Sequence, residues 1–142
     1  MLSAYSACFF KEDSGYSVIF PDLNYLSTCG STLDEALSMA VDCLAGYLFW
    51  LEKDGESAPP ASDKVDLEAV ASELEISCNG AFVNVITVDV AEYARTHFEK
   101  SVKKTLSIPA WLNDAALKQG INFSQVLQEA LKKELHFSQK QA

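Results

Sequence analysis

The sequence predicts an α+β protein in which an acidic N-terminal domain, ordered β-β-β-α-(α)-β, precedes a small β-α-α domain. Short apolar runs suited to strands alternate with segments of helical periodicity, and the charge changes sign along the chain. Residues 1–100 hold five Lys and Arg against 17 Asp and Glu, a net charge of −12, whereas residues 101–142 hold six against three, a net charge of +3. We therefore expect domains at 1–95 and 101–142, joined by a connector at 96–100.

The chain begins with two short aromatic-rich runs, residues 5–10 and 16–20, separated by the polar segment 11–15. Two apolar runs around a polar, Gly-containing turn are typical of a β-hairpin. Pro21 ends the second strand because it cannot donate to a strand ladder. Residues 26–29 form a third short extended segment, so the domain starts with three strands.

The longest predicted helix begins after Thr32 and ends at residues 54–55. Thr32 and Glu35 have the spacing of a capping box, and apolar residues follow at helical spacing: Leu33, Ala36, Leu37, Ala40, Val41, Leu44, Leu48 and Leu51. A loop with two prolines and a weak helix over 67–74 come next. The β-branched run 81–90 is apolar on both faces, which predicts a central strand, and residues 91–100 are expected to form a polar connector.

The tail opens with an alternating segment in which Val102, Leu106 and Ile108 share one face. Such alternation predicts a half-buried strand. Pro109 then starts a helix, which Gly120 ends. Asn122 and Gln125 form a capping pair for a second helix with apolar residues at helical spacing: Phe123, Val126, Leu127, Ala130, Leu131 and Leu135.

A unit of roughly forty residues buries too little surface to be stable as a monomer without a disulfide, a metal or a second chain. The tail has no disulfide or metal-ligand spacing, so the sequence predicts a homodimer and leaves open whether dimers pair into a tetramer. Strand, helix, turn and helix in this order resemble the ribbon-helix-helix family of DNA-binding proteins over about residues 102–136. In that family, one strand from each of two chains forms an antiparallel ribbon in the DNA major groove.

Carried onto this sequence, the resemblance implies that one set of side chains faces base edges from the ribbon: Lys103, Thr105 and Ser107. It implies that a second set lies at the helix N-terminus that faces a phosphate: Asn122, Phe123 and Ser124. The alternative is that the lysines of the tail are an ordinary solvated surface. A local excess of Lys and Arg is what nucleic-acid binding requires, and together with the order of the elements it favours contact with operator DNA.

The N-terminal domain carries a second resemblance. Phe-Pro-Asp-Leu at 20–23, Thr-Cys-Gly-Ser-Thr at 28–32 and Glu-Ala at 35–36 are similar to the N-terminal domain of the HicB family of antitoxins. The chain departs from the family at 24–26, where many members have a Pro-Gly turn. The resemblance implies a truncated RNase H-like fold followed by a ribbon-helix-helix tail.

The same resemblance implies a function, that of an antitoxin in a type II toxin-antitoxin system. The partner would be a HicA-type toxin, a small basic protein that cleaves mRNA with a His, and the tail would repress the shared promoter. A domain of charge −12 attracts such a basic partner. The candidate toxin-binding residues lie on loops at strand ends: Glu12, Asp13 and Asp22. Acidic loops of this kind are also commonly just solvated.

The sequence argues against an enzyme or a metal site. It contains no Gly-rich phosphate loop and no nucleophile or zinc motif, and its two histidines, His97 and His136, lie in the connector and near the C-terminus. The four cysteines have no C-x-x-C spacing, so we expect free buried thiols and no metal: Cys8, Cys29, Cys43 and Cys78. No cofactor is expected.

No run approaches the ~18 apolar residues of a membrane span, and no basic segment leads the apolar N-terminus, so we expect a soluble, cytoplasmic protein without a membrane partner. The alternative function is a stand-alone ribbon-helix-helix transcription regulator whose N-terminal domain senses a ligand or supports oligomers. A nuclease is the weakest alternative, because a metal-dependent site needs several converging carboxylates.

Overall fold

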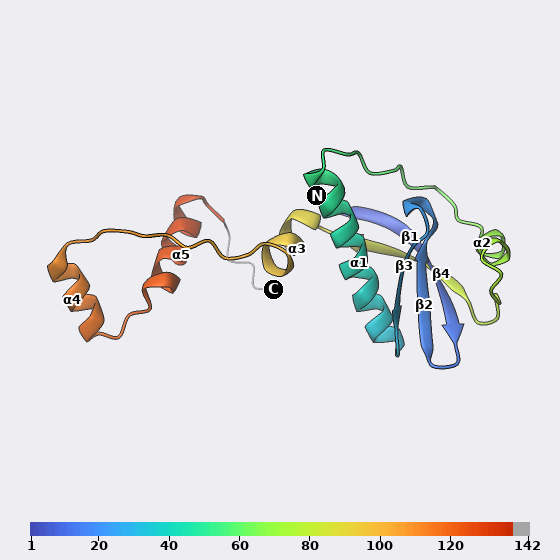
Figure 1. The fold of residues 1–142 in the computed structure, drawn as a ribbon, viewed down its shortest axis with the longest axis horizontal. Coiled ribbons are helices and arrows are strands. Elements are labelled where there is room, and N and C mark those ends of the chain that lie inside the picture. The colour runs from blue at the N-terminus through green and yellow to red at the C-terminus, as the bar shows by residue number, and fades with distance from the viewer. Residues whose placement is uncertain (138–142) are drawn as a thin grey trace. The chain divides into compact units, whose positions relative to one another are not determined.

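The computed structural model describes residues 1–137. The chain divides into two compact units, Met1–Lys100 and Ser101–Ala142 (Figure 1).

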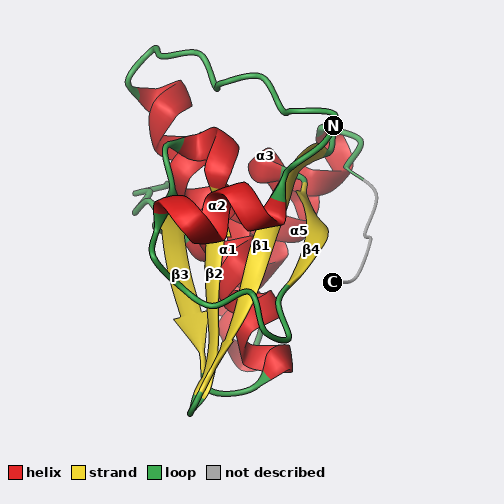
Figure 2. Cartoon of the chain, turned by 90° about the vertical axis from the view of Figure 1, so that its right-hand side faces the viewer, coloured by secondary structure: helices red, strands yellow, loops and turns green. Residues whose placement is uncertain are grey.

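The N-terminal unit is built on one antiparallel sheet of four strands in the order β3-β2-β1-β4 (Figure 2). The strands are β1 (Ser3–Glu12), β2 (Gly15–Phe20), β3 (Leu26–Gly30) and β4 (Phe82–Val88). The three predicted N-terminal strands are confirmed, each slightly longer than expected. The chain returns to the sheet only at β4, which pairs with β1 along its whole length.

The predicted long helix is confirmed as α1 (Leu33–Lys53). The Thr32 hydroxyl accepts a hydrogen bond from the Glu35 amide at 3.1 Å, and the Glu35 carboxylate accepts from the Ser31 amide at 3.0 Å. The first bond satisfies an amide that the first helical turn would otherwise leave unpaired, and the second ties the residue before the cap to the helix. Gly30 lets the helix approach the sheet, since a Cβ there would lie 2.3 Å from the Ala36 nitrogen.

Both faces of the sheet carry apolar clusters. On one face, α1 packs against fully buried residues of β1 and β2, including Phe9, Val18 and Phe20. On the other face, α2 (Leu67–Glu73) covers a smaller cluster: Cys8, Phe10, Ile19, Val70 and Ala71. The N-terminal unit therefore has a core that is complete within one chain.

β4 was predicted as a central strand, and this is wrong, because it lies at the edge of the sheet. Its residues that face α1, Ile86 and Val88, are buried, whereas Val83 and Val85 on the opposite face are 39% and 56% exposed. Helix α2 covers only part of that face. The apolar residues on the two sides of β4 therefore differ in role: Ile86 and Val88 complete the core, and Val83 and Val85 remain accessible.

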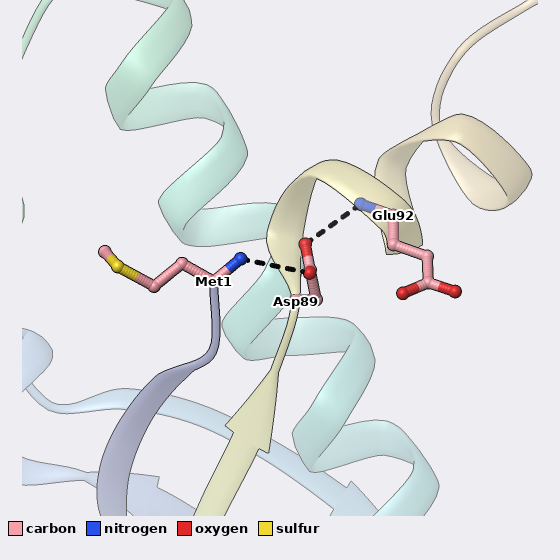
Figure 3. A network of polar contacts seen from close by, with 3 residues as sticks. All are labelled: Met1, Asp89 and Glu92. Carbon is pink, nitrogen blue, oxygen red and sulfur yellow. Dashed lines mark hydrogen bonds and ion pairs between the residues drawn. The ribbon is translucent and has the colours of Figure 1, made fainter. Parts of the chain in front are cut away.

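The segment expected to be a polar connector, 91–100, contains a further helix, α3 (Val90–His97). The Asp89 carboxylate accepts hydrogen bonds from the Glu92 amide and from the amine of Met1, both at 3.2 Å (Figure 3). Phe98, just after the helix, packs against the main core. The capping pair and Phe98 hold these residues on the N-terminal unit.

The C-terminal unit contains α4 (Ala110–Lys118) and α5 (Phe123–Glu134). Asn122 accepts a hydrogen bond from the Gln125 amide at 3.1 Å, as predicted, and Gly120 has a φ of 65° after α4. Residues 101–109 form neither strand nor helix in the single chain, so the expected strand is not formed. A strand needs a hydrogen-bonded neighbour, and one chain contains no second copy of this segment.

None of the helices within residues 1–137 has the length and hydropathy needed to cross a membrane.

Candidate interaction surfaces

The three acidic residues predicted to contact a toxin fall at two separate places. Glu12 ends β1 and Asp13 lies in the turn that follows, whereas Asp22 lies in the short 3-10 helix Pro21–Leu23 after β2. β2 stands between the two places, and its six residues span about 17 Å at roughly 3.3 Å per residue. The residues therefore do not form one acidic patch.

Asp22 has a structural partner. Its carboxylate accepts hydrogen bonds from the Ser62 amide at 2.7 Å and from the Ser62 hydroxyl at 2.6 Å. The Tyr5 hydroxyl donates to the Pro59 carbonyl at 2.5 Å, so two contacts hold the loop 54–66 on the sheet. Burial, with Asp22 nearby, raises the pKa of Tyr5.

Glu12 also has a partner within the fold, because its carboxylate accepts a hydrogen bond from the Ser17 hydroxyl on the neighbouring strand.

The candidate DNA-binding residues all belong to the C-terminal unit and all are exposed: Lys103, Thr105, Ser107, Asn122, Phe123 and Ser124. The Asn122 side chain caps α5, and the Ser124 hydroxyl accepts from the Gln128 side chain at 3.1 Å. The first backbone amides of a helix have no intrahelical acceptor. The N-terminus of α5 therefore offers amides that point along the helix axis, where anions bind favourably.

The C-terminal unit leaves its apolar side chains uncovered. No residue between 101 and 137 is buried, and many large apolar side chains are exposed: Val102, Leu106, Ile108, Trp111, Leu112, Leu117, Ile121, Phe123, Val126, Leu131, Leu135 and Phe137. So many exposed large apolar side chains in one small unit indicate an interaction surface. These side chains include the alternating face of 102–108 and the helical stripe of α5.

The sequence interpretation missed the exposed edge of β4. It placed Val83 and Val85 on a second buried face, but α2 leaves both side chains accessible. The available signal was Asn84 and Thr87, polar residues inside an otherwise apolar strand. Polar residues are uncommon in strands that are covered on both faces.

The described residues offer no arrangement suited to a metal: within 1–137, no three or more His, Cys, Asp and Glu side chains group together in that way. The cysteines are free, but the expectation that all are buried holds only for Cys8, since Cys43 and Cys78 are half-buried and Cys29 is exposed. Its side chain lies on the face of β3 opposite α1. Burial, with Cys78 and Asp22 nearby, raises the pKa of Cys8 to about 11, so this thiol is a poor nucleophile at neutral pH.

His97 also has a structural explanation. Its ring stacks on that of Tyr93, with centroids 3.8 Å apart and planes 7° from parallel. The Tyr93 hydroxyl donates to Asp42 at 2.9 Å. The bond to Asp42 joins α3 to α1, and the ring stack lies within α3.

The chain is similar to known proteins in sequence and structure. Residues 5–130 match a family model described as a HicB-like antitoxin of bacterial toxin-antitoxin systems. A chain of a toxin-antitoxin complex from Streptococcus pneumoniae is 31% identical, with 94% of this chain and 99% of that chain covered and a TM-score of 0.62. The antitoxin HicB of Burkholderia pseudomallei is 21% identical over 94% of this chain and 96% of that one, with a TM-score of 0.48.

No curated protein matches the chain. The family match nevertheless covers most of the sequence, and the Streptococcus pneumoniae chain matches over nearly its full length. The chain therefore belongs to the HicB-like antitoxins of bacterial toxin-antitoxin systems, a family that is not enzymatic.

Proposed function

We propose that this antitoxin neutralises a small, basic, mRNA-cleaving toxin of the HicA type through its N-terminal unit and represses its own operon through its C-terminal unit. The observation that carries the proposal is the family match over residues 5–130. The similar Streptococcus pneumoniae chain comes from a toxin-antitoxin complex, which supports a toxin as the partner.

The charge of the N-terminal unit supports neutralisation by occlusion. A net charge of −12 over residues 1–100 attracts a basic protein and competes with RNA for its surface. Steering by charge raises the association rate more than it fixes the geometry of the complex. The shape of the contact must therefore come from a defined surface.

The proposal predicts that a gene for a small basic protein lies beside the gene of this chain, and the purified product of that neighbouring reading frame tests neutralisation. We expect this small basic protein to cleave RNA alone and to lose activity when the antitoxin is added in equal amount. Residues 1–100 should retain the inhibition, whereas residues 101–142 alone should not. The cut belongs after Lys100 because Phe98 packs on the core. Inhibition by the C-terminal unit alone would contradict the proposal.

For DNA, we propose that the 102–108 segments of two chains pair as an antiparallel ribbon. Pairing would place Lys103, Thr105 and Ser107 of both chains toward base edges, and the amides of Phe123 and Ser124 would hold phosphates. The exposed apolar side chains of the C-terminal unit support this dimer, because a second copy would cover them.

Operator titrations at two salt concentrations test the ribbon. Thr105→Ala should weaken binding to the cognate operator by about 1–3 kcal/mol for each base edge that the hydroxyl no longer reaches. Lys132→Ala, far along α5, serves as the control and should change little. Neither substitution should alter toxin binding. If Thr105→Ala and Ser107→Ala bind the operator as the unchanged protein does, the ribbon does not read DNA.

A further inference from the structure

The two edge strands of the sheet differ in a way that points to a second binding surface. β3 is five residues long, and its exposed side chains are the small Ser27 and Cys29. β4 is seven residues long, contains no charged residue, Pro or Gly, and exposes Val83 and Val85. Natural proteins protect free edges with short strands, charges, Pro or bulges. β4 has none of these features, and β3 is the shorter of the two edge strands.

The strand register identifies which backbone groups β4 leaves free. Glu12 pairs with Gly15 across a two-residue turn, and the pair that closes such a turn exchanges both hydrogen bonds. Glu12 therefore points its backbone N–H and C=O groups toward β2. Because this direction alternates along a strand, Phe9 and Ala7 point theirs toward β4. Their partners Phe82 and Asn84 point back toward β1.

By the same alternation, Val83, Val85 and Thr87 point their N–H and C=O groups away from the sheet. Within residues 1–137, no backbone bond outside regular helices and strands involves these three residues. Their side chains are also exposed. One row of residues thus presents free backbone donors and acceptors together with an apolar surface, which is the arrangement that binds an added strand.

We propose that the β4 edge docks an extended segment of the basic toxin as a fifth strand, an inference that rests on the proposed function. The backbone groups of Val83, Val85 and Thr87 would supply the hydrogen bonds, and the two valines would supply the apolar contact. Glu92 lies just beyond the strand, in the first turn of α3, so a basic partner meets negative charge at that end. The β4 edge would fix how the toxin is oriented in the complex, which attraction between charges alone does not.

Charge decides between this occupant and a second copy of the chain. Pairing β4 with β4 would bring together two units that each carry a net charge of −12, and like charges oppose such contact. A basic protein meets attraction at the same edge. The toxin is therefore the occupant that the charges favour.

Hydrogen exchange gives a direct test with the full-length protein. In the free protein, the amides of Val83, Val85 and Thr87 should exchange quickly, because they have no acceptor. Adding the purified product of the neighbouring reading frame should slow them by about tenfold or more, as expected for newly formed strand bonds. Ser27 and Cys29, the matching outward residues of β3, are the internal control and should not change.

Substitutions provide a second test. Val85→Glu adds negative charge, so steering alone predicts toxin affinity that is unchanged or improved. Edge docking instead predicts a loss of about tenfold or more, as for a residue at the centre of an interface. Val85→Pro removes an outward N–H without removing a bond to β1 and should also weaken binding. Cys29→Glu adds the same charge to the other edge and should not.

The outcomes separate this inference from the proposed function. If the unchanged protein does not bind the toxin, the proposed function fails and the inference fails with it. If it binds, but the β4 amides stay unprotected and the Val85 variants bind normally, only the inference is overturned. Light scattering of the Val85→Glu variant without toxin should give the same molar mass as the unchanged protein. A smaller molar mass would show that the β4 edge binds a second copy of the chain.

Discussion

The two units of this antitoxin both contain capped helices, but the N-terminal unit buries its apolar side chains and the C-terminal unit leaves them exposed. In the N-terminal unit, Phe9, Phe20 and Leu44 are completely buried. In the C-terminal unit, no residue between 101 and 137 is buried, and α5 keeps an apolar stripe exposed. Since both units have helices with side-chain caps at Thr32 and Asn122, local helix signals do not explain the difference.

What differs is where the covering surface comes from. The N-terminal unit supplies both a sheet and the helices that cover it, so its core closes within one chain. The C-terminal unit has two short helices and a segment without a strand partner, which bury too little surface alone. Stability of the first unit should therefore be a property of one chain, and stability of the second should depend on protein concentration.

The largest effect should come from the closed core. Phe9 is fully buried and stacks on Phe82, with ring centroids 4.9 Å apart. Phe9→Ala should lower the free energy of unfolding of the N-terminal unit by about 3–5 kcal/mol. Urea denaturation at two protein concentrations checks this, and the loss should be the same at both. A loss that changes with concentration would show that this core is shared between chains.

Leu131 provides the opposite case, because its side chain is 52% exposed in the single chain. Leu131→Ala should weaken the dimer by about 2 kcal/mol, roughly 30-fold in the dissociation constant. Sedimentation equilibrium measures this change, and Lys132→Ala at the next position is the matched control. If Leu131→Ala leaves association unchanged, α5 does not form the dimer core.

The same contrast explains how much of the fold the sequence could predict. Strands β1 to β3 and α1 depend on local signals, namely aromatic runs, Pro21 and the Thr32 cap, and all were predicted. The edge position of β4 was missed because it depends on which strand pairs with which, and an apolar run alone does not reveal this. Helix α3 was missed because its N-cap, Asp89, was placed in the predicted strand 81–90 and the residues that follow look polar.

For the candidate surfaces too, features set by local sequence could be predicted and contacts between distant residues could not. The exposed face of the C-terminal unit could be predicted, because size and periodicity together required a partner. The separate positions of Asp13 and Asp22 could also be predicted, because the predicted strand 16–20 lies between them in the sequence. The bond between Asp22 and Ser62 joins residues that are forty positions apart, a pairing that no local pattern encodes.

Asp22 offers a smaller effect that separates a structural role from contact with the toxin. Asp22→Asn and Ser62→Ala should each lower the stability of the N-terminal unit by about 1–2 kcal/mol, and the double variant should lose less than the sum. Thermal unfolding of the four proteins measures this coupling. If Asp22→Asn weakens toxin binding while Ser62→Ala does not, Asp22 contacts the toxin directly.

The smallest effect should be a dependence of stability on pH that distinguishes helix α1 from helix α5. Hydrogen bonds from the Ser31 hydroxyl and then from its amide lower the pKa of the Glu35 carboxyl in the folded protein. A lowered pKa means that the ionised form stabilises the fold above the unfolded pKa of about 4.3, and this contribution is lost as the pH falls through the folded pKa. The first turn of α5 has no acidic residue and carries Gln125 at the equivalent position.

We therefore expect Glu35→Gln to reduce the stability of the N-terminal unit slightly at pH 7. The difference from the unchanged protein should shrink as the pH falls below about 4.3. Urea denaturation across this pH range measures the difference. Gln125→Glu is the reciprocal variant and should give the dimer of the C-terminal unit a similar dependence, because a carboxylate would then stand at the N-terminus of α5. If the Glu35→Gln difference is the same at pH 3 as at pH 7, the ionised carboxylate does not stabilise α1, and the two helix starts are equivalent despite their different first turns.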